Sequence, residues 1–234
     1  NTGVEGDNNQ QDNFNTGFNM NIFQNFNDAN NLCNLSNMDE ATGGNIFNAD
    51  MFSDPFERGY FDVVWSSGVL HHTENPEKGF NIISTWLKPG GYIVIGLYNL
   101  YGRMRTGFRQ KLFKLLGSGK LARIIVSLFD PVLRKEISKQ KKDAWFQDQY
   151  EHPVETWHTI DDVLTWFAKN DIEFISSIPT ANGNIVEYSD IFVKQNEGNW
   201  VTRVVSQVGM LFSPLGGEGG LFLVIGKKKV DNNK

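Results

Sequence analysis

Residues 60–98 contain the pattern that most constrains the fold, because a strand, a helix and a second strand follow one another closely. "YFDVVWSS" is rich in β-branched and aromatic residues and predicts a strand. "NPEKGFNIISTWLK" predicts a helix, with Asn75 as its N-cap and Pro76 at its first position. "KPGG" predicts the end of this helix and a turn, and "YIVIGLY" a strand buried on both faces. Together they predict a βαβ unit with a right-handed crossover.

The first strand of this unit ends in small polar residues, and two histidines follow. In open α/β sheets, ligands bind outside the carboxyl ends of the strands. Ser66, Ser67 and Gly68 occupy such an end and allow a ligand to approach the backbone closely. His71 and His72 come just beyond, and histidine has a pKa suited to proton transfer near neutral pH. We therefore expect a binding cleft at this strand end, edged by titratable groups.

The C-terminal half contains further regular elements. Thr159 and Asp162 form a capping-box pattern at the start of "TIDDVLTWFAKND", which predicts a helix. "IEFISSIP" and "GLFLVIGKKK" predict strands. Residues 180–219 are otherwise irregular, except for a predicted helix near "NWVTRVVSQVGMLF".

The N-terminal part has a different composition. It is dense in asparagine, a poor residue for helix and strand interiors, and no Lys or Arg precedes Arg58. These features are typical of a disordered or weakly folded segment. Several apolar side chains favour a folded segment instead: Phe14, Phe18, Ile22, Phe23 and Phe26. Both interpretations, a disordered or weakly folded segment and a folded one, remain open.

Residues 101–142 are strongly basic and amphipathic. They contain twelve Lys or Arg against only Asp130 and Glu136. Three interpretations apply: a helical lid whose apolar stripe packs on the domain, an interfacial helix attracted to anionic lipid, or a phosphate or nucleic-acid patch. We favour the lid, and expect its stripe to face the domain and its basic groups to face outward. The predicted stripe consists of Met104, Phe108, Leu112 and Leu115.

Composition limits the class of protein. A chain of 234 residues with 40% hydrophobic residues suits a single domain with a sizeable core. No apolar run has membrane-spanning length and no signal pattern begins the chain, so we expect a cytoplasmic protein. Cys33 is the only cysteine, which excludes an internal disulfide and a cysteine-rich metal site. The net charge of −5 argues against a general nucleic-acid binder.

Residues 46–99 resemble the class I S-adenosylmethionine-dependent methyltransferases. "FDVVWSSGVLHH" and "LKPGGYIVIG" look like the family's fourth and fifth strands. "HTIDDVLTWFAKNDIEFISS" and "GLFLVIGKKK" are similar to its last helix and closing antiparallel strands. "NADMFSDPF" resembles the segment before the fourth strand, where an acidic residue matching Asp50 commonly contacts the adenine, with Met51 beside it. The resemblance thus adds Asp50 and Met51 to the strand-end residues as expected cofactor contacts.

The chain departs from this family at the glycine-rich cofactor turn. The nearest candidate is "VEGDNNQQDNF", in which Glu5 and Gly6 match only the first half of the family's pattern. Asp28 is the candidate for the acid that binds the ribose hydroxyls, in a shifted register. Glycines allow close approach to a ligand, so their replacement predicts altered, weakened or lost cofactor binding.

The resemblance implies a Rossmann-like α/β fold: a mostly parallel sheet with an antiparallel final strand and an inserted helical lid. We expect one methyltransferase-like domain over residues 1–234, with an atypical Asn-rich part at 1–45, a lid at 101–155 and a second insertion at 180–219. The implied function is methyl transfer from S-adenosylmethionine to a small molecule, with His71 and His72 as catalytic candidates and no metal. The alternative is a catalytically inactive module that binds a ligand or a membrane surface.

Overall fold

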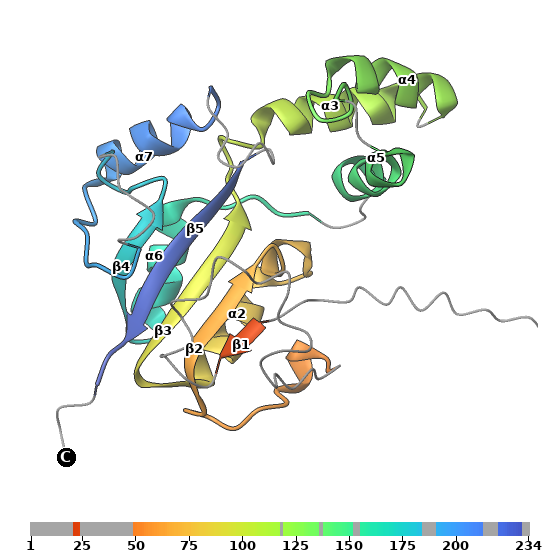
Figure 1. The fold of residues 1–234 in the computed structure, drawn as a ribbon. Helices are drawn as coiled ribbons and strands as arrows, with labels where there is room; N and C mark the ends of the chain where they lie inside the picture. The colour runs from red at the N-terminus through yellow and green to blue at the C-terminus, as the bar shows by residue number, and fades with distance from the viewer. Residues whose placement is uncertain are drawn as a thin grey trace, which may run out of the picture.

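A computed structural model describes residues 21–23, 49–117, 119–135, 138–151, 155–183, 191–212 and 220–230 (Figure 1). These residues form one five-stranded sheet with helices packed on it and a helical group beyond one end. The strands are β1 (Asn21–Phe23), β2 (Phe61–Ser67), β3 (Leu87–Tyr98), β4 (Ile172–Ile178) and β5 (Leu221–Lys228). None of the helices in these ranges is long and apolar enough to cross a membrane.

The sheet has the strand order β1-β2-β3-β5-β4. β2 and β3 pair in parallel, whereas β5 runs antiparallel to both β3 and β4. β2, β3 and β4 therefore point the same way, and their carboxyl ends share one edge of the sheet. The predicted antiparallel final strand is confirmed. "Mostly parallel" describes this common direction, although β2–β3 is the one adjacent parallel pair among the described strands.

The predicted βαβ unit is present. Its helix is α2 (Pro76–Thr85), and the Asn75 side chain accepts a hydrogen bond from the Lys78 backbone N–H at 2.9 Å. The predicted turn at "KPGG" is wrong, because these residues lie within β3. The pairing jumps from Phe61 with Leu87 to Val63 with Tyr92, so residues 88–91 form an irregularity in a continuous strand.

The main core lies between the sheet and α2 with α6 (Ile160–Lys169), which pack against each other. Phe80 of α2 lies 5.5 Å from Trp166 and 5.7 Å from Phe167 between ring centroids. Trp86, at the end of α2, is fully buried and donates its indole N–H to Asp54 Oδ1 at 2.6 Å. These contacts hold α2 and α6 against each other and against the sheet.

The predicted elements of the C-terminal half are confirmed. The Thr159 hydroxyl accepts from the Asp162 N–H at 3.2 Å while the Asp162 carboxylate accepts from the Thr159 N–H at 2.8 Å, completing the capping box of α6. The predicted helix near residue 200 is α7 (Trp200–Gly209). Gln207 of α7 is fully buried, and its Oε1 accepts from Asn99 Nδ2 at 2.8 Å and the Ile160 N–H at 2.9 Å. This contact joins α7 to the end of β3 and the start of α6.

Part of the Asn-rich N-terminal segment is ordered. Residues 21–23 form β1, which pairs antiparallel with β2 through Asn21 and Trp65, Ile22 and Val64, and Phe23 and Val63. The folded interpretation holds for these three residues. The other residues before 49 lie outside the described ranges.

Residues 101–151 contain α3 (Met104–Leu115), α4 (Lys120–Phe129), α5 (Lys139–Phe146) and a π-helical turn at Gln147–Glu151. The predicted orientation of the α3 stripe is wrong. Phe108 is 71% exposed and Leu115 84%, and Met104 is also exposed, whereas Leu112 is half-buried. The small residues Thr106 and Gly107 face inward instead, because the side chain of Trp157 occupies the space above Gly107.

These helices form a core of their own, separate from the sheet. Its buried members are Phe113, Ala122, Val126, Leu133, Phe146 and Tyr150. Buried Asp130 accepts from the Tyr150 hydroxyl at 2.6 Å. Burial alone would raise the pKa of Asp130, but hydrogen bonds from Tyr150, the backbone and Trp145 lower it overall. Burial, then this carboxylate, raises the pKa of Tyr150. A charged Asp130 therefore holds the turn after α4 against the segment that follows α5.

Candidate functional site

Ser66, Ser67 and Gly68 lie at the carboxyl end of β2, which is flanked by β1 and β3 and is therefore not an edge strand. Ser66 is fully buried, and its hydroxyl has no hydrogen-bond partner among the described residues. Gly68 has φ +78° and open space around the position of a Cβ. The strand end thus offers a buried polar group and a turn open to a ligand.

The two histidines lie in a short 3-10 helix, Leu70–His72, directly after this strand end. His71 is fully buried, and its ring centroid lies 4.0 Å from that of Tyr98 at the end of β3. His72 is half-buried, with its ring 4.2 Å from His71 and 5.7 Å edge-on to Tyr98. The structure therefore brings both predicted histidines to the carboxyl edge of the sheet, in contact with one aromatic side chain.

The segment 155–158 crosses this edge as an extra extended stretch. The Thr156 N–H donates to the His71 carbonyl at 2.9 Å, and the His158 N–H donates to the Tyr98 carbonyl at 2.8 Å. The Thr156 hydroxyl and His158 Nε2 are 2.9 Å apart. Burial lowers the pKa of His158, partly offset by the Asp162 charge, so the neutral ring is favoured. The segment ties the 3-10 helix to the end of β3.

A buried arginine organises the same region. The Arg103 side chain is fully buried and forms a two-pronged ion pair with Glu155, at 3.1 Å from Nε and 2.5 Å from Nη2. Its guanidinium carbon lies 3.8 Å from the Tyr98 ring centroid. Arg103 also donates to Gln149 Oε1, and Gln149 Nε2 to the Tyr98 hydroxyl at 3.2 Å. Glu155 compensates the buried charge of Arg103, as burial of an ion requires. Arg103 thereby links Tyr98 to the helical insertion.

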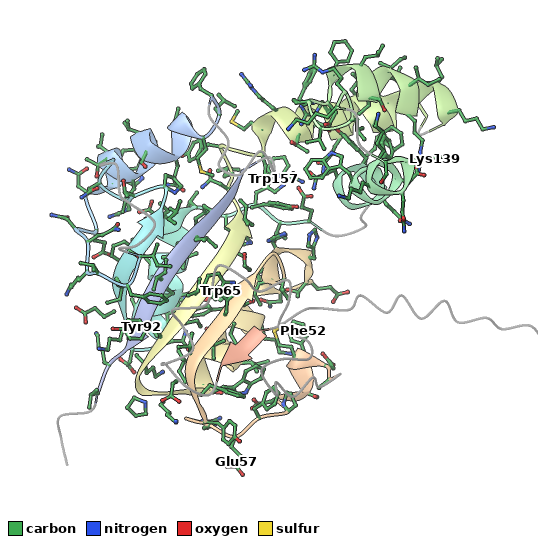
Figure 2. All side chains as sticks on the ribbon, in the orientation of Figure 1. Phe52, Glu57, Trp65, Tyr92, Lys139 and Trp157 are labelled. Carbon is green, nitrogen blue, oxygen red and sulfur yellow. The ribbon has the colours of Figure 1, made fainter. Side chains whose placement is uncertain are left out.

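An apolar pocket of about 600 Å³ opens beside this network. It lies where the chain leaves β3 and enters α3, with Trp157 as its large aromatic wall (Figure 2). The Trp157 indole N–H donates to Glu155 Oε1 at 2.5 Å, which fixes the ring. The lining residues are Leu100, Tyr101, Met104, Gly107, Phe108, Lys111 and Trp157. Such a pocket suits an apolar small molecule.

Asp50 and Met51 are placed before β2, as expected, but both have structural contacts. Asp50 Oδ1 accepts from the Phe52 N–H at 2.9 Å and caps the 3-10 helix Met51–Ser53. Met51 is buried, and its methyl carbon lies 3.0 Å from a Cβ built on Gly79. Asp50 remains exposed. Their predicted contact with adenine stays a prediction.

Three predicted cofactor residues, Glu5, Gly6 and Asp28, lie outside the described residues. No group of three or more His, Cys, Asp or Glu in the described part of the chain is arranged to hold a metal ion. Among the predicted cofactor residues that the structure describes, those at the strand end have the features of a ligand site. The orphaned Ser66 hydroxyl and the open turn at Gly68 fit the close approach of a polar ligand.

Comparison with known proteins agrees with this geometry. The sequence pattern of the family described as "Methyltransferase domain" matches residues 20–95, which span β1, β2, α2 and most of β3. Residues 20–95 therefore resemble a methyltransferase domain. PKMT2 from Rickettsia typhi in complex with AdoHcy has a similar fold, with a TM-score of 0.52 and 14% identity over 76% of this chain and 37% of that one. This likeness shows the fold, so the predicted Rossmann-like architecture is confirmed.

Two curated relatives match parts of the chain. An uncharacterised protein of Synechococcus sp. is 27% identical over 133 residues, which is 50% of this chain and 32% of that protein. A reducing polyketide synthase of Botryotinia fuckeliana is 48% identical over 60 residues, which is 24% of this chain and 2% of that protein. The chain thus spans a third or less of the length of either relative.

Sequence reasoning missed Tyr98, Arg103 and Trp157, which the structure brings to the site. Tyr98 was assigned only to a strand, and Arg103 was counted only as one of many basic residues. The available signal was weak: Arg103 is the first Lys or Arg after the buried strand, and Arg105 follows closely. The Glu155 partner, 52 residues away, leaves no local pattern in the sequence.

Proposed function

We propose that this methyltransferase domain transfers the methyl group of S-adenosylmethionine to an apolar small molecule. The observation that carries the proposal is the buried Ser66 hydroxyl without a described partner, beside the open turn at Gly68. A buried polar group without a partner is unfavourable unless a ligand or water satisfies it. S-adenosylmethionine, when bound, supplies an electrophilic methyl group.

The acceptor would bind in the apolar pocket beside Trp157. The pocket lies just beyond the carboxyl end of β3, the strand that pairs in parallel with β2. Ser66, Ser67 and Gly68 are not among its lining residues. Apolar walls favour an acceptor with an aromatic or aliphatic body and exclude water from it. Orientation of the acceptor would then supply much of the rate, since correct alignment of two reactants lowers the barrier by itself.

The two histidines receive different roles in this proposal. His72 is half-buried beside Tyr98 and does not line the pocket, so it would accept a proton at a ring nitrogen from an acceptor group that extends out of the pocket toward it. His71 is fully buried against Tyr98, and its carbonyl accepts from Thr156, so it would hold the 3-10 helix in place. We therefore expect His72 to act on the acceptor and His71 to be a positioning residue.

The test is transfer of labelled methyl from S-adenosylmethionine to a panel of aromatic and aliphatic alcohols, phenols and amines. We expect transfer to apolar members, with a roughly 100-fold lower kcat in His72→Ala, the scale of general-base catalysis. His71→Ala should lower the thermal unfolding midpoint as well as the rate. Transfer confined to strongly polar acceptors would overturn the assignment of the pocket.

The inactive-module alternative rests on one specific observation, the sequence "GDNNQQ" after Glu5, where glycines are expected. Binding of S-adenosylmethionine without transfer to any member of the panel would favour this alternative. The absence of both binding and transfer would contradict the enzyme and the cofactor-binding module alike.

A further inference from the structure

α4 presents an apolar stripe to solvent. Leu121, Ile124 and Leu128 are 68%, 61% and 64% exposed, and their spacing places them on one face of the helix. We call these three residues the α4 stripe. The opposite face of α4 is occupied, because Ala122 and Val126 are fully buried in the core of the helical insertion. The stripe is therefore not needed for packing within the described fold.

Further apolar side chains extend this surface beyond the stripe. Phe129 at the end of α4 is 62% exposed, and Leu115 and Leu116 at the end of α3 are 84% and 39% exposed. Exposed apolar groups that cluster in this way mark a binding surface more often than isolated ones do. α3 and α4 lie side by side beyond the end of the sheet (Figure 1). α5 packs against their buried side, and the α4 stripe stays exposed.

Basic side chains surround the same helices. The exposed Lys and Arg residues of the insertion are Arg105, Lys111, Lys114, Lys120, Arg134, Lys135, Lys139 and Lys141. Lys114 and Lys120 flank the turn between α3 and α4, next to the start of the stripe. Asp130 is buried with its own hydrogen-bond donors, so it does not neutralise this surface. Asp143 of α5 is exposed, but the exposed Lys and Arg residues outnumber it, so this surface is positive although the whole chain carries a net charge of −5.

We infer that α4 and the end of α3 dock on an anionic lipid surface. A bilayer with anionic headgroups matches both features, since it offers negative charge at the level of the lysines and an apolar interior for the stripe. A second copy of this chain fits less well, because a symmetric contact would bring two positive surfaces together. Docking would also bring the neighbouring pocket mouth, at Met104 and Phe108, near the membrane.

The experiment is co-sedimentation of the full chain with vesicles of phosphatidylcholine alone and of phosphatidylcholine mixed with phosphatidylglycerol. We expect binding to the mixed vesicles at low ionic strength, little binding to the neutral ones, and release by salt. Lys114→Gln with Lys120→Gln should weaken binding about 25-fold, since each basic residue contributes about fivefold at such a surface. Leu121→Ser with Ile124→Ser and Leu128→Ser should weaken it about tenfold or more.

The matched control is Val201→Ser with Val205→Ser on α7. These residues are also exposed, at 57% and 65%, but the nearby Arg203 is paired with Asp161 at 2.7 Å. This control should bind vesicles like the parent chain, and circular dichroism should show that each variant is folded. Equal binding to both vesicle types, no binding, or unchanged binding by the stripe variant would overturn the inference. A dimer in light scattering that the stripe variant abolishes would overturn it in favour of a second copy.

Discussion

Ser66 is the residue on which the proposed cofactor site most depends. Its hydroxyl is buried without a described partner, so Ser66→Ala should leave the free energy of unfolding of the ligand-free chain unchanged or raise it by about 1 kcal/mol. The same change should weaken binding of S-adenosylmethionine roughly tenfold, the value of one lost hydrogen bond to a charged or polar ligand. Denaturant unfolding and calorimetric titration measure the two effects.

Ser84→Ala is the matched control for this prediction. Ser84 is equally buried, but its hydroxyl has acceptors for its one proton in the Asn81 carbonyl at 2.8 Å and Asn170 Oδ1 at 3.0 Å. Its loss should lower the free energy of unfolding by about 1 kcal/mol and leave cofactor affinity unchanged. If Ser66→Ala behaves like Ser84→Ala in both measurements, Ser66 is a structural residue only.

His158 predicts a dependence of stability on pH. Burial lowers its pKa in the folded chain below the usual 6.5. As the pH falls from 6.5 toward the folded-state pKa, the unfolded state binds more protons than the folded state does. The contribution of His158 to stability is therefore fully present above this window and is lost as the pH falls through it. In His158→Gln, which can keep a hydrogen bond to Thr156, this part of the slope should disappear. Denaturant unfolding of both chains between about pH 5 and pH 8 checks it; identical slopes would contradict it.

At the scale of elements, the contact between α3 and the segment 155–158 defines the pocket. A Cβ added at Gly107 would lie 2.1 Å from Trp157 Cη2, so Gly107→Ala must displace this ring. We expect a loss of roughly 1–3 kcal/mol in the free energy of unfolding, as for other overpacked sites, and a change in tryptophan fluorescence. The matched change is Gly209→Ala in α7, where nothing lies within 4 Å of the added Cβ. Removing a helical glycine there should stabilise by up to about 1 kcal/mol.

The orientation of α3 also shows which features a local sequence pattern cannot predict. Strand β2, helix α2 and its Asn75 cap were predictable because their signals are local: β-branched runs, a capping side chain and a proline at the first turn. The orientation of α3 was not, because both of its faces carry some apolar or small residues. The face with Gly107 packs inward only because Trp157, 50 residues away in the chain, fills the space above it.

At the scale of the whole molecule, the carboxyl edge of the sheet could be predicted and its supporting network could not. The strand-end residues Ser66 and Gly68 and the histidines follow from a βαβ pattern and a family resemblance. The links from Tyr98 to Arg103 and Glu155 depend on contacts between distant segments, which a single sequence does not encode in any regular spacing. The predicted effect of the substituted glycine pattern after Glu5, a weaker cofactor site than is usual for the family, also belongs to this scale and stays a prediction.

The most direct test of the account is calorimetric titration of the full chain with S-adenosylmethionine. We expect saturable binding of one molecule per chain, because the described residues provide one candidate strand-end site, at Ser66 and Gly68. Absence of any binding heat up to millimolar cofactor, with S-adenosylhomocysteine equally silent, would contradict the claim that this domain uses S-adenosylmethionine.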